Sequence, residues 1–186
     1  FVSAPSANTS GRPSPTTARH VEEDLSGKID MILDGGTVDI GLESTILDMT
    51  VSPPMILRPG AITAEMFEKV IGQVDVDKTL LSEESTQAPK APGMKYRHYA
   101  PKAKLIMVEG DLREEILAIR QISYEADRKG KPIGIIATSE TLPFYNHGIV
   151  KNIGTRENEK TIARNLYSIL REFDEENVDT IYSESF

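Results

Sequence analysis

The feature that most constrains this chain is the regular alternation of strand-like and helix-like segments after residue 103. Four short apolar runs predict strands, at residues 105–108, 132–137, 149–153 and 180–182. Two longer stretches with apolar residues every three or four positions predict helices, over residues 112–129 and 159–176. Strands that alternate with helices of this length form βαβ units, whose strands pair in parallel. Residues 104–186 are therefore predicted to form a small parallel-sheet domain of the α/β class.

The first 81 residues are also predicted to mix strands and helices, with a less regular pattern. Three strands are expected, at residues 29–33, 44–49 and 55–57, and the nearly continuous apolar runs are typical of a buried sheet. One helix is expected to begin at a Ser14 cap, with Pro15 in its first turn, and to run to about Leu25. A second is expected over 63–71, and turns are expected at 34–36 and 59–60.

Residues 82–103 separate these two regions and predict an interdomain linker. The segment contains three prolines and no hydrophobic periodicity. Its centre reads Pro92-Gly-Met-Lys-Tyr-Arg-His-Tyr-Ala-Pro101, with two tyrosines, a histidine and two cations. A passive spacer needs none of these side chains, so we expect the linker to take part in the site. The predicted division is 1–81, 82–103 and 104–186.

Composition excludes several classes of function. The net charge is −8, and residues 1–81 hold twice as many acidic as basic residues, which argues against a broad basic surface for nucleic acid. The chain has no cysteine, which excludes disulfides and thiolate metal sites and fits a reducing, cytoplasmic compartment. No apolar run is long enough to span a bilayer. Because the chain starts at Phe1, in a strand-like run, we expect a piece of a longer polypeptide.

The densest polar segment reads Ala4-Pro-Ser-Ala-Asn-Thr-Ser-Gly-Arg-Pro-Ser-Pro-Thr16. It places hydroxyls and an amide between a strand-like run and a helix start. Such groups, together with backbone N–H groups, suit phosphate or carboxylate. An ordinary polar loop with a helix cap explains the same residues and is the more frequent case.

Two shorter motifs are further candidates. Gly41-Leu-Glu-Ser-Thr45 offers the Ser44 hydroxyl as a hydrogen-bond donor beside a glycine that lets a ligand approach, although a plain turn fits equally well. Leu57-Arg58-Pro-Gly60 offers an arginine whose guanidinium could donate two hydrogen bonds to a phosphate, although such an arginine more often forms an ion pair at the surface. The histidines lack metal-ligand spacing, and acidic residues in turns, such as Asp34, are usually solvated.

Taken in order, these motifs resemble the Sua5/YciO/YrdC family. Ala-Pro-Ser-Ala-Asn-x-Ser-Gly, Ser-Pro-Thr, Asp-Gly-Gly, Gly-Leu-Glu-Ser-Thr and Leu-Arg-Pro-Gly are similar to the second half of a YrdC-type domain. The Tyr- and His-containing linker resembles that of the two-domain Sua5 proteins, and residues 104–186 resemble most of their C-terminal domain. The resemblance implies a partial YrdC-like twisted open sheet with helices, followed by a small Rossmann-like parallel-sheet domain.

The resemblance also implies an activity and its residues. The family makes threonylcarbamoyl-AMP and pyrophosphate from ATP, L-threonine and bicarbonate, for threonylcarbamoylation of tRNA by a downstream transfer machinery. Mg²⁺ is expected to enter with ATP, and no protein metal ligand or acid–base catalyst is implied. The pattern assigns ATP contacts to Ser6, Asn8, Ser14, Arg58 and Tyr99, and threonine contacts to the Ala4 backbone and Ser44.

The resemblance leaves three expectations to weigh. An upstream basic segment of the family's ATP site is absent from residues 1–186, so we expect the full protein to be active and this chain alone to be inactive. The alternative function is a non-catalytic module that binds RNA or tRNA, which the acidic balance of residues 1–81 disfavours. Residues 104–186 contain no phosphate-binding sequence motif. We expect them to support the linker, which would act as a lid, or to dock a partner protein.

Overall fold

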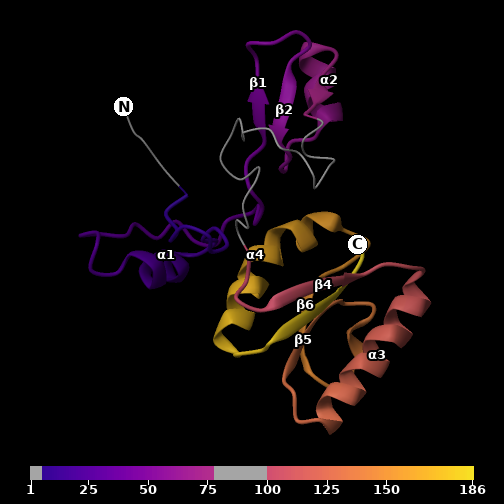
Figure 1. The fold of residues 1–186 in the computed structure, drawn as a ribbon. Coiled ribbons are helices and arrows are strands. Elements are labelled where there is room, and N and C mark those ends of the chain that lie inside the picture. The colour runs from indigo at the N-terminus through magenta and orange to yellow at the C-terminus, as the bar shows by residue number, and fades with distance from the viewer. Residues whose placement is uncertain (1–5, 78–99) are drawn as a thin grey trace. The chain divides into compact units, whose positions relative to one another are not determined.

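The computed structural model describes residues 6–77 and 100–186 of the 186-residue chain. Within these ranges the chain forms two compact units (Figure 1). One joins residues 6–41 to residues 100–186, and the other comprises residues 42–77. The predicted boundaries at 81 and 103 stay a prediction, since most of the linker lies outside the described ranges. In the described part of the chain, no helix combines the length and apolar character needed to cross a bilayer.

Residues 104–186 form the predicted parallel sheet. Its strands are β4 (Lys104–Val108), β5 (Ile133–Thr138), β6 (Ile149–Gly154) and β7 (Thr180–Glu184). They pair in parallel in the order β4-β7-β5-β6. Helix α3 (Leu112–Arg128) connects β4 to β5, a 3₁₀ turn, η2 (Leu142–Phe144), precedes β6, and α4 (Glu159–Glu175) connects β6 to β7. All six predicted elements of this region are confirmed, with ends that differ by one or two residues.

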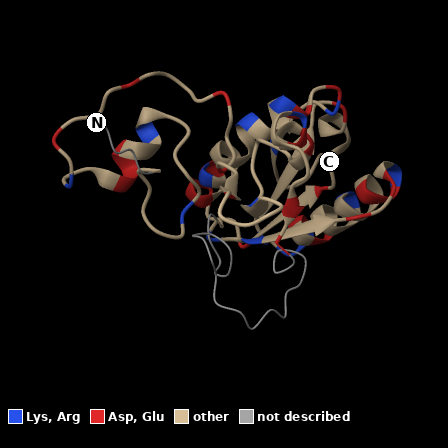
Figure 2. Ribbon diagram, turned by 90° about the horizontal axis from the view of Figure 1, so that it is seen from above, with Lys and Arg blue, Asp and Glu red and all other residues tan. Residues whose placement is uncertain are grey.

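The two helices cover opposite faces of the sheet, as Figure 1 shows. Side chains alternate along β5, so Ile135 packs with Ile119 of α3, whereas Ile136 packs in the cluster that contains Phe173 of α4. The Phe173 ring lies over Gly134, where an added Cβ would stand 2.5 Å from Phe173 Cε1. The sheet therefore has two apolar cores, one under each helix. Acidic and basic residues both occur along these helices (Figure 2).

Residues 42–77 form a smaller three-stranded sheet. Strand β1 (Ile46–Asp48) pairs antiparallel with β2 (Met55–Arg58), and β3 (Asp75–Val76) pairs parallel with β2. Helix α2 (Ala64–Ile71) begins at Thr63, whose hydroxyl accepts a hydrogen bond from the Met66 N–H. The predicted strands at 44–49 and 55–57 and the helix at 63–71 are confirmed, although β1 is shorter than expected.

The segment from residue 6 to residue 41 corrects two predictions. Helix α1 (Ala18–Leu25) ends as predicted but is capped by Thr17 instead of Ser14. The reason is that the Thr17 hydroxyl accepts the His20 N–H, while the His20 ring accepts the Thr16 N–H, so the turn before Ala18 is held outside the helix by side chains.

The predicted strand at residues 29–33 is wrong. These residues form an irregular, exposed segment, and no described strand pairs with them. An apolar run without a pairing partner cannot satisfy its backbone as a strand. The predicted turn at residues 34–36 is confirmed, because Asp34 Oδ1 accepts the Gly36 N–H at 2.8 Å and Gly36 has φ +88°.

Candidate functional site

The loop that carries Ser6 and Asn8 is organised by its own polar side chains. The Ser6 hydroxyl donates to Asn8 Oδ1 at 2.5 Å. The Asn8 amide donates to the carbonyls of Thr9 and Arg12, both at 3.1 Å. The Arg12 N–H in turn donates to the Thr9 carbonyl at 3.1 Å. Asn8 therefore closes a compact turn, and Ser6 stands at its exposed end.

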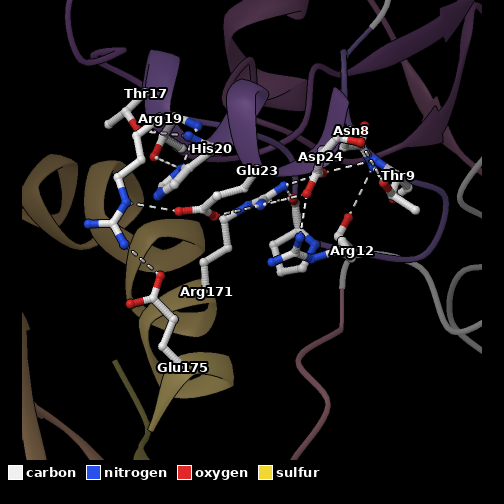
Figure 3. Close-up of polar contacts among 12 residues, drawn as sticks. Asn8, Thr9, Arg12, Thr17, Arg19, His20, Glu23, Asp24, Arg171 and Glu175 are labelled. Atoms are coloured by element: carbon white, nitrogen blue, oxygen red, sulfur yellow. Dashed lines mark hydrogen bonds and ion pairs between the residues drawn. The ribbon is translucent and has the colours of Figure 1, made fainter. Parts of the chain in front are cut away.

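Asp24 of α1 anchors this loop. Its carboxylate is fully buried and accepts the Thr9 N–H at 2.9 Å. It also forms ion pairs with Arg12 and with Arg171 of α4 (Figure 3). Burial of Asp24 works against its ionisation, but the hydrogen bonds from Arg171 and Thr9 outweigh it and lower the pKa of this carboxyl group. Asp24 is thus held as a carboxylate inside the protein.

Arg171 reaches the loop from the parallel-sheet domain. Its side chain is 1% exposed. Nε and Nη2 donate to the Pro13 carbonyl at 3.0 and 2.6 Å, and Nη1 and Nη2 donate to the Asp24 carboxylate at 3.2 and 2.8 Å. One guanidinium therefore binds both the loop backbone and the acid that anchors the loop.

His20 is a structural residue in this arrangement. Its ring is buried, and Nδ1 accepts the Thr16 N–H at 3.2 Å (Figure 3 shows the residue beside Thr17). Burial, followed by the positive charge of Arg171, lowers the pKa of His20. The neutral imidazole is favoured, and it fixes the backbone where the loop enters α1.

Ser44 and Arg58 form a second polar group, inside the smaller unit. Arg58 Nε donates to the Ser44 carbonyl at 3.0 Å, and Nη2 donates to Ser44 Oγ at 3.0 Å. Glu43 lies 3.6 Å from the same guanidinium. Gly60 is required here, because an added Cβ would stand 2.3 Å from the Glu43 carbonyl oxygen. Residues from both motifs, Glu43 and Ser44 from the first and Arg58 and Gly60 from the second, are therefore built into one tight structure.

The structure thus pairs Ser6 with Asn8 and Ser44 with Arg58, each pair within its own unit. Ser14 follows Pro13, whose carbonyl binds Arg171. Two predicted site residues, Ala4 and Tyr99, lie outside the described ranges.

Sequence reasoning missed the ion-pair cluster of Arg12, Asp24 and Arg171. Asp24 and Arg171 stand 147 positions apart, and nothing local in the sequence marks them as partners.

The chemistry available at both groups is anion recognition. Hydroxyls, an amide and guanidinium groups donate hydrogen bonds and supply positive charge, which suits phosphate and carboxylate groups. Among residues 6–77 and 100–186, no three His, Asp or Glu side chains gather in a way that could hold a metal ion.

Two family models match the chain. The model described as "Threonylcarbamoyl-AMP synthase, C-terminal domain" (Sua5_C) matches residues 62–186. The model described as "Telomere recombination" (Sua5_yciO_yrdC) matches residues 1–60. The two matches together follow the chain almost from end to end.

Similar proteins carry one name. The chain is 45% identical to the threonylcarbamoyl-AMP synthase of Bacillus subtilis over 185 residues, covering 100% of this chain and 52% of the relative. It is 44% identical to the enzyme of the same name from Pyrococcus abyssi, covering 98% of this chain and 52% of the relative. The chain therefore spans about half the length of the curated relatives it matches.

Solved structures agree with these similarities. A crystal structure of Sua5 from P. abyssi in complex with L-threonine superposes with a TM-score of 0.85 at 43% identity, covering 98% of this chain and 52% of that one. A variant of the same protein superposes with a TM-score of 0.86 at 41% identity. Each match covers 98% of this chain.

Proposed function

The chain belongs to the Sua5 family, and we propose that the protein containing it makes threonylcarbamoyl-AMP and pyrophosphate from ATP, L-threonine and bicarbonate. The observation that carries this proposal is the 45% identity to a threonylcarbamoyl-AMP synthase over 185 residues, which includes both polar groups. The P. abyssi Sua5 structure with bound L-threonine supports the amino-acid substrate. The product would supply a threonylcarbamoyl group to the machinery that modifies tRNA.

The reaction is a nucleotidyl transfer. Threonine and bicarbonate first condense to a carbamate, with loss of water. A carbamate oxygen then attacks the α-phosphorus of ATP, so that one O–P bond forms while the bond to the β-phosphate bridging oxygen breaks, and pyrophosphate leaves. Charge builds on the phosphate oxygens as the bonds exchange, so positioning and hydrogen-bond donation are the main contributions a protein can make.

The residues of this chain are assigned to those contributions. Ser6, Asn8 and Ser14 would contact the nucleotide from their loop. Ser44 would donate to threonine: its Oγ already accepts a hydrogen bond from Arg58 at 3.0 Å, which leaves the hydroxyl proton for a ligand. Arg58, which holds the Ser44 backbone and hydroxyl through Nε and Nη2, is assigned to the ATP side by the family resemblance. The proposed contacts of Ala4 with threonine and of Tyr99 with phosphate rest on the family resemblance.

Mg²⁺ is proposed to enter as the counter-ion of ATP, bound mainly through the nucleotide's phosphates. This is common for Mg²⁺, which usually binds substrate phosphates and keeps several waters. The transferase that consumes the product, and tRNA itself, are proposed partners. A cytoplasmic location is proposed because ATP, bicarbonate and tRNA meet there.

Pyrophosphate release by the full-length protein tests the proposal. The assay contains ATP, Mg²⁺ and bicarbonate, with and without L-threonine, and the adenylate product is identified by mass spectrometry. Threonine-dependent release is the expected result. Release that does not depend on threonine, from protein with a native circular-dichroism spectrum, would discard the proposal and favour the RNA-binding alternative.

Variants of the second polar group sharpen the test. Ser44→Ala is expected to raise the KM for threonine more than that for ATP, because it removes the donor assigned to the amino acid. Arg58→Lys is expected to reduce kcat with ATP, since lysine keeps the charge but loses the two-pronged geometry. Thr50→Ala in the same unit serves as the matched control, since its hydroxyl bonds only to the nearby Asp48 in the described structure.

A further inference from the structure

Arg171 joins the parallel-sheet domain to the loop that carries Ser6, Asn8 and Ser14. We propose that Arg171 is a positioning residue for nucleotide binding, which sets the shape of this loop from α4 without touching the substrate. The inference rests on the proposed function, because the loop's contacts with ATP are themselves proposed. It gives residues 104–186 a role in shaping the proposed nucleotide site, in addition to the expected support of the linker.

Arg171 contacts the loop directly at Pro13. Two nitrogens of Arg171 donate to a single backbone carbonyl, at 3.0 and 2.6 Å. Pro13 immediately precedes Ser14, so this pair of bonds fixes the peptide from which the Ser14 side chain projects. A proline carbonyl held by two donors leaves that peptide little freedom to rotate.

Arg171 also reaches the loop indirectly, through Asp24. Arg171 binds both oxygens of this carboxylate, and the carboxylate accepts the Thr9 N–H at 2.9 Å. The Thr9 carbonyl accepts the amide of Asn8, whose Oδ1 accepts the Ser6 hydroxyl (Figure 3 shows Asn8, Thr9, Asp24 and Arg171 together). A continuous set of hydrogen bonds therefore leads from Arg171 to each of the other two proposed nucleotide contacts.

Both members of the Arg171–Asp24 ion pair are buried. The side chains of Arg171 and Asp24 are 1% and 0% exposed, so water cannot replace either partner. Lysine at this position would keep the charge but would present one ammonium group in place of a planar fork, and could not bind Pro13 and both oxygens of Asp24 at once. The geometry therefore requires arginine.

A second ion pair supplies a matched control. Arg19 of α1 donates to Glu175 of α4 at 3.0 Å, so it joins the same two helices. Its side chain is 71% exposed and it does not contact the loop backbone in the described structure. A variant of Arg19 removes a bridge between α1 and α4 without disturbing Pro13 or Asp24.

The experiment measures steady-state pyrophosphate release by the full-length protein carrying Arg171→Lys, Asp24→Asn or Arg19→Met. Arg171→Lys and Asp24→Asn are expected to raise the KM for ATP by about tenfold or more, as for a misplaced binding group. The KM for threonine and the circular-dichroism spectrum should change little. Arg19→Met should leave both KM values within about twofold of the wild type. The double variant of Arg171 and Asp24 should have a KM for ATP no higher than that of the more impaired single variant, because both residues act through one set of contacts.

Several outcomes would overturn the inference. The inference is refuted if the wild type is active and the folded variants Arg171→Lys and Asp24→Asn have an unchanged KM for ATP. The proposed function would then still stand. If the Arg171 and Asp24 variants raised the KM for ATP and the KM for threonine equally, Arg171 would be only a general structural residue. The same would follow if Arg19→Met raised the KM for ATP as much as they do. A wild type without threonine-dependent activity would reject the proposed function first, and the inference with it. Should Arg171→Lys fail to fold, the near-isosteric Asp24→Asn decides the question.

Discussion

The parallel-sheet domain and the N-terminal segment of the same unit differ in the balance of what they bury. The domain buries mainly aliphatic and aromatic side chains on both faces of its sheet, with Ile135 and Ile181 fully enclosed, beside a smaller set of polar groups that includes Glu115 and Glu184. The segment from residue 6 to residue 41 buries mainly polar side chains, among them Thr16, His20 and Asp24. Apolar burial tolerates many partners, whereas a buried ion pair requires one particular partner in one particular place. The domain is therefore robust, and the segment is specific.

The largest effect is expected from breaking the core under α4. Phe173→Ala should lower the free energy of unfolding by about 3–5 kcal/mol, because it removes a buried ring and leaves a cavity. Urea denaturation followed by circular dichroism measures the change. Leu117→Ala, at an exposed position of α3, is the control and should have little effect. A loss below about 1 kcal/mol for Phe173→Ala would mean that the core can collapse around the gap.

Removing Arg171 should have a somewhat smaller and more local effect. Arg171→Met leaves Asp24 buried with Arg12 as its remaining ion-pair partner, and should cost about 3 kcal/mol. Hydrogen exchange should show lost protection at residues 9–25, while the amides of β5 and β7 stay protected. Uniform loss of protection through the sheet would contradict the distinction between the two regions.

Gly134→Ala tests the tightness of the apolar region. The added methyl group would stand 2.5 Å from Phe173 Cε1, so the ring must move, at a cost of about 1–3 kcal/mol. Combining it with Phe173→Leu should recover part of this loss, because the smaller side chain makes room. Thermal denaturation of the single and double variants measures the coupling. Strict additivity would show that the ring is not the obstacle.

Mild acid should weaken the polar region selectively. Burial and the charges of Arg171 and Arg19 lower the pKa of His20 below its ordinary 6.5 and outweigh Glu23 and Asp24, so the unfolded chain binds the proton more readily. Stability from this source is complete above pH 6.5 and is lost as the pH falls below that value. Denaturation at pH 7.5 and 5.5 should show a loss that His20→Gln reduces. An equal loss in the variant would assign the effect to other groups.

The smallest effect is expected from the exposed bridge between the helices. Arg19→Met breaks ion pairs whose members are largely in water, where attraction is screened and side-chain ordering opposes it. Its melting temperature should match that of the wild type within error. A clearly lower melting temperature would show that exposed charges also stabilise the position of α1. Buried and exposed ion pairs would then not differ as proposed for Arg171 and Arg19.

The same contrast explains what the sequence could predict. Strands β4 to β7 and both of their helices follow from local periodicity, because each segment's own pattern shows which face it buries. The Ser44 and Arg58 motifs were predicted separately, and the structure shows them in contact. The prediction of a strand at 29–33 is wrong because strand formation depends on a neighbouring strand to pair with, and composition alone does not decide it.

The ion-pair cluster could not be predicted at all. Nothing near Asp24 distinguishes it from Glu22 or Glu23, since all three are acids on one short helix. Only the fold places Arg171 against it. Likewise, the start of α1 depends on a contact of the His20 ring with Thr16, which a list of capping residues does not contain. Tertiary contacts between polar groups leave little trace in a single sequence.

The contacts of the Arg171 guanidinium also constrain how the sequence can evolve and how the protein can be engineered. Asp24 and Arg171 lie on either side of the linker, so neither position can change without penalty unless the other changes with it. Among descendants of this chain the two should vary as a pair. A chimera that takes its C-terminal domain from a relative should tolerate the graft only when the donor supplies an arginine at this place. Residues 60–62, where the two family matches meet, are therefore not a safe point at which to exchange domains.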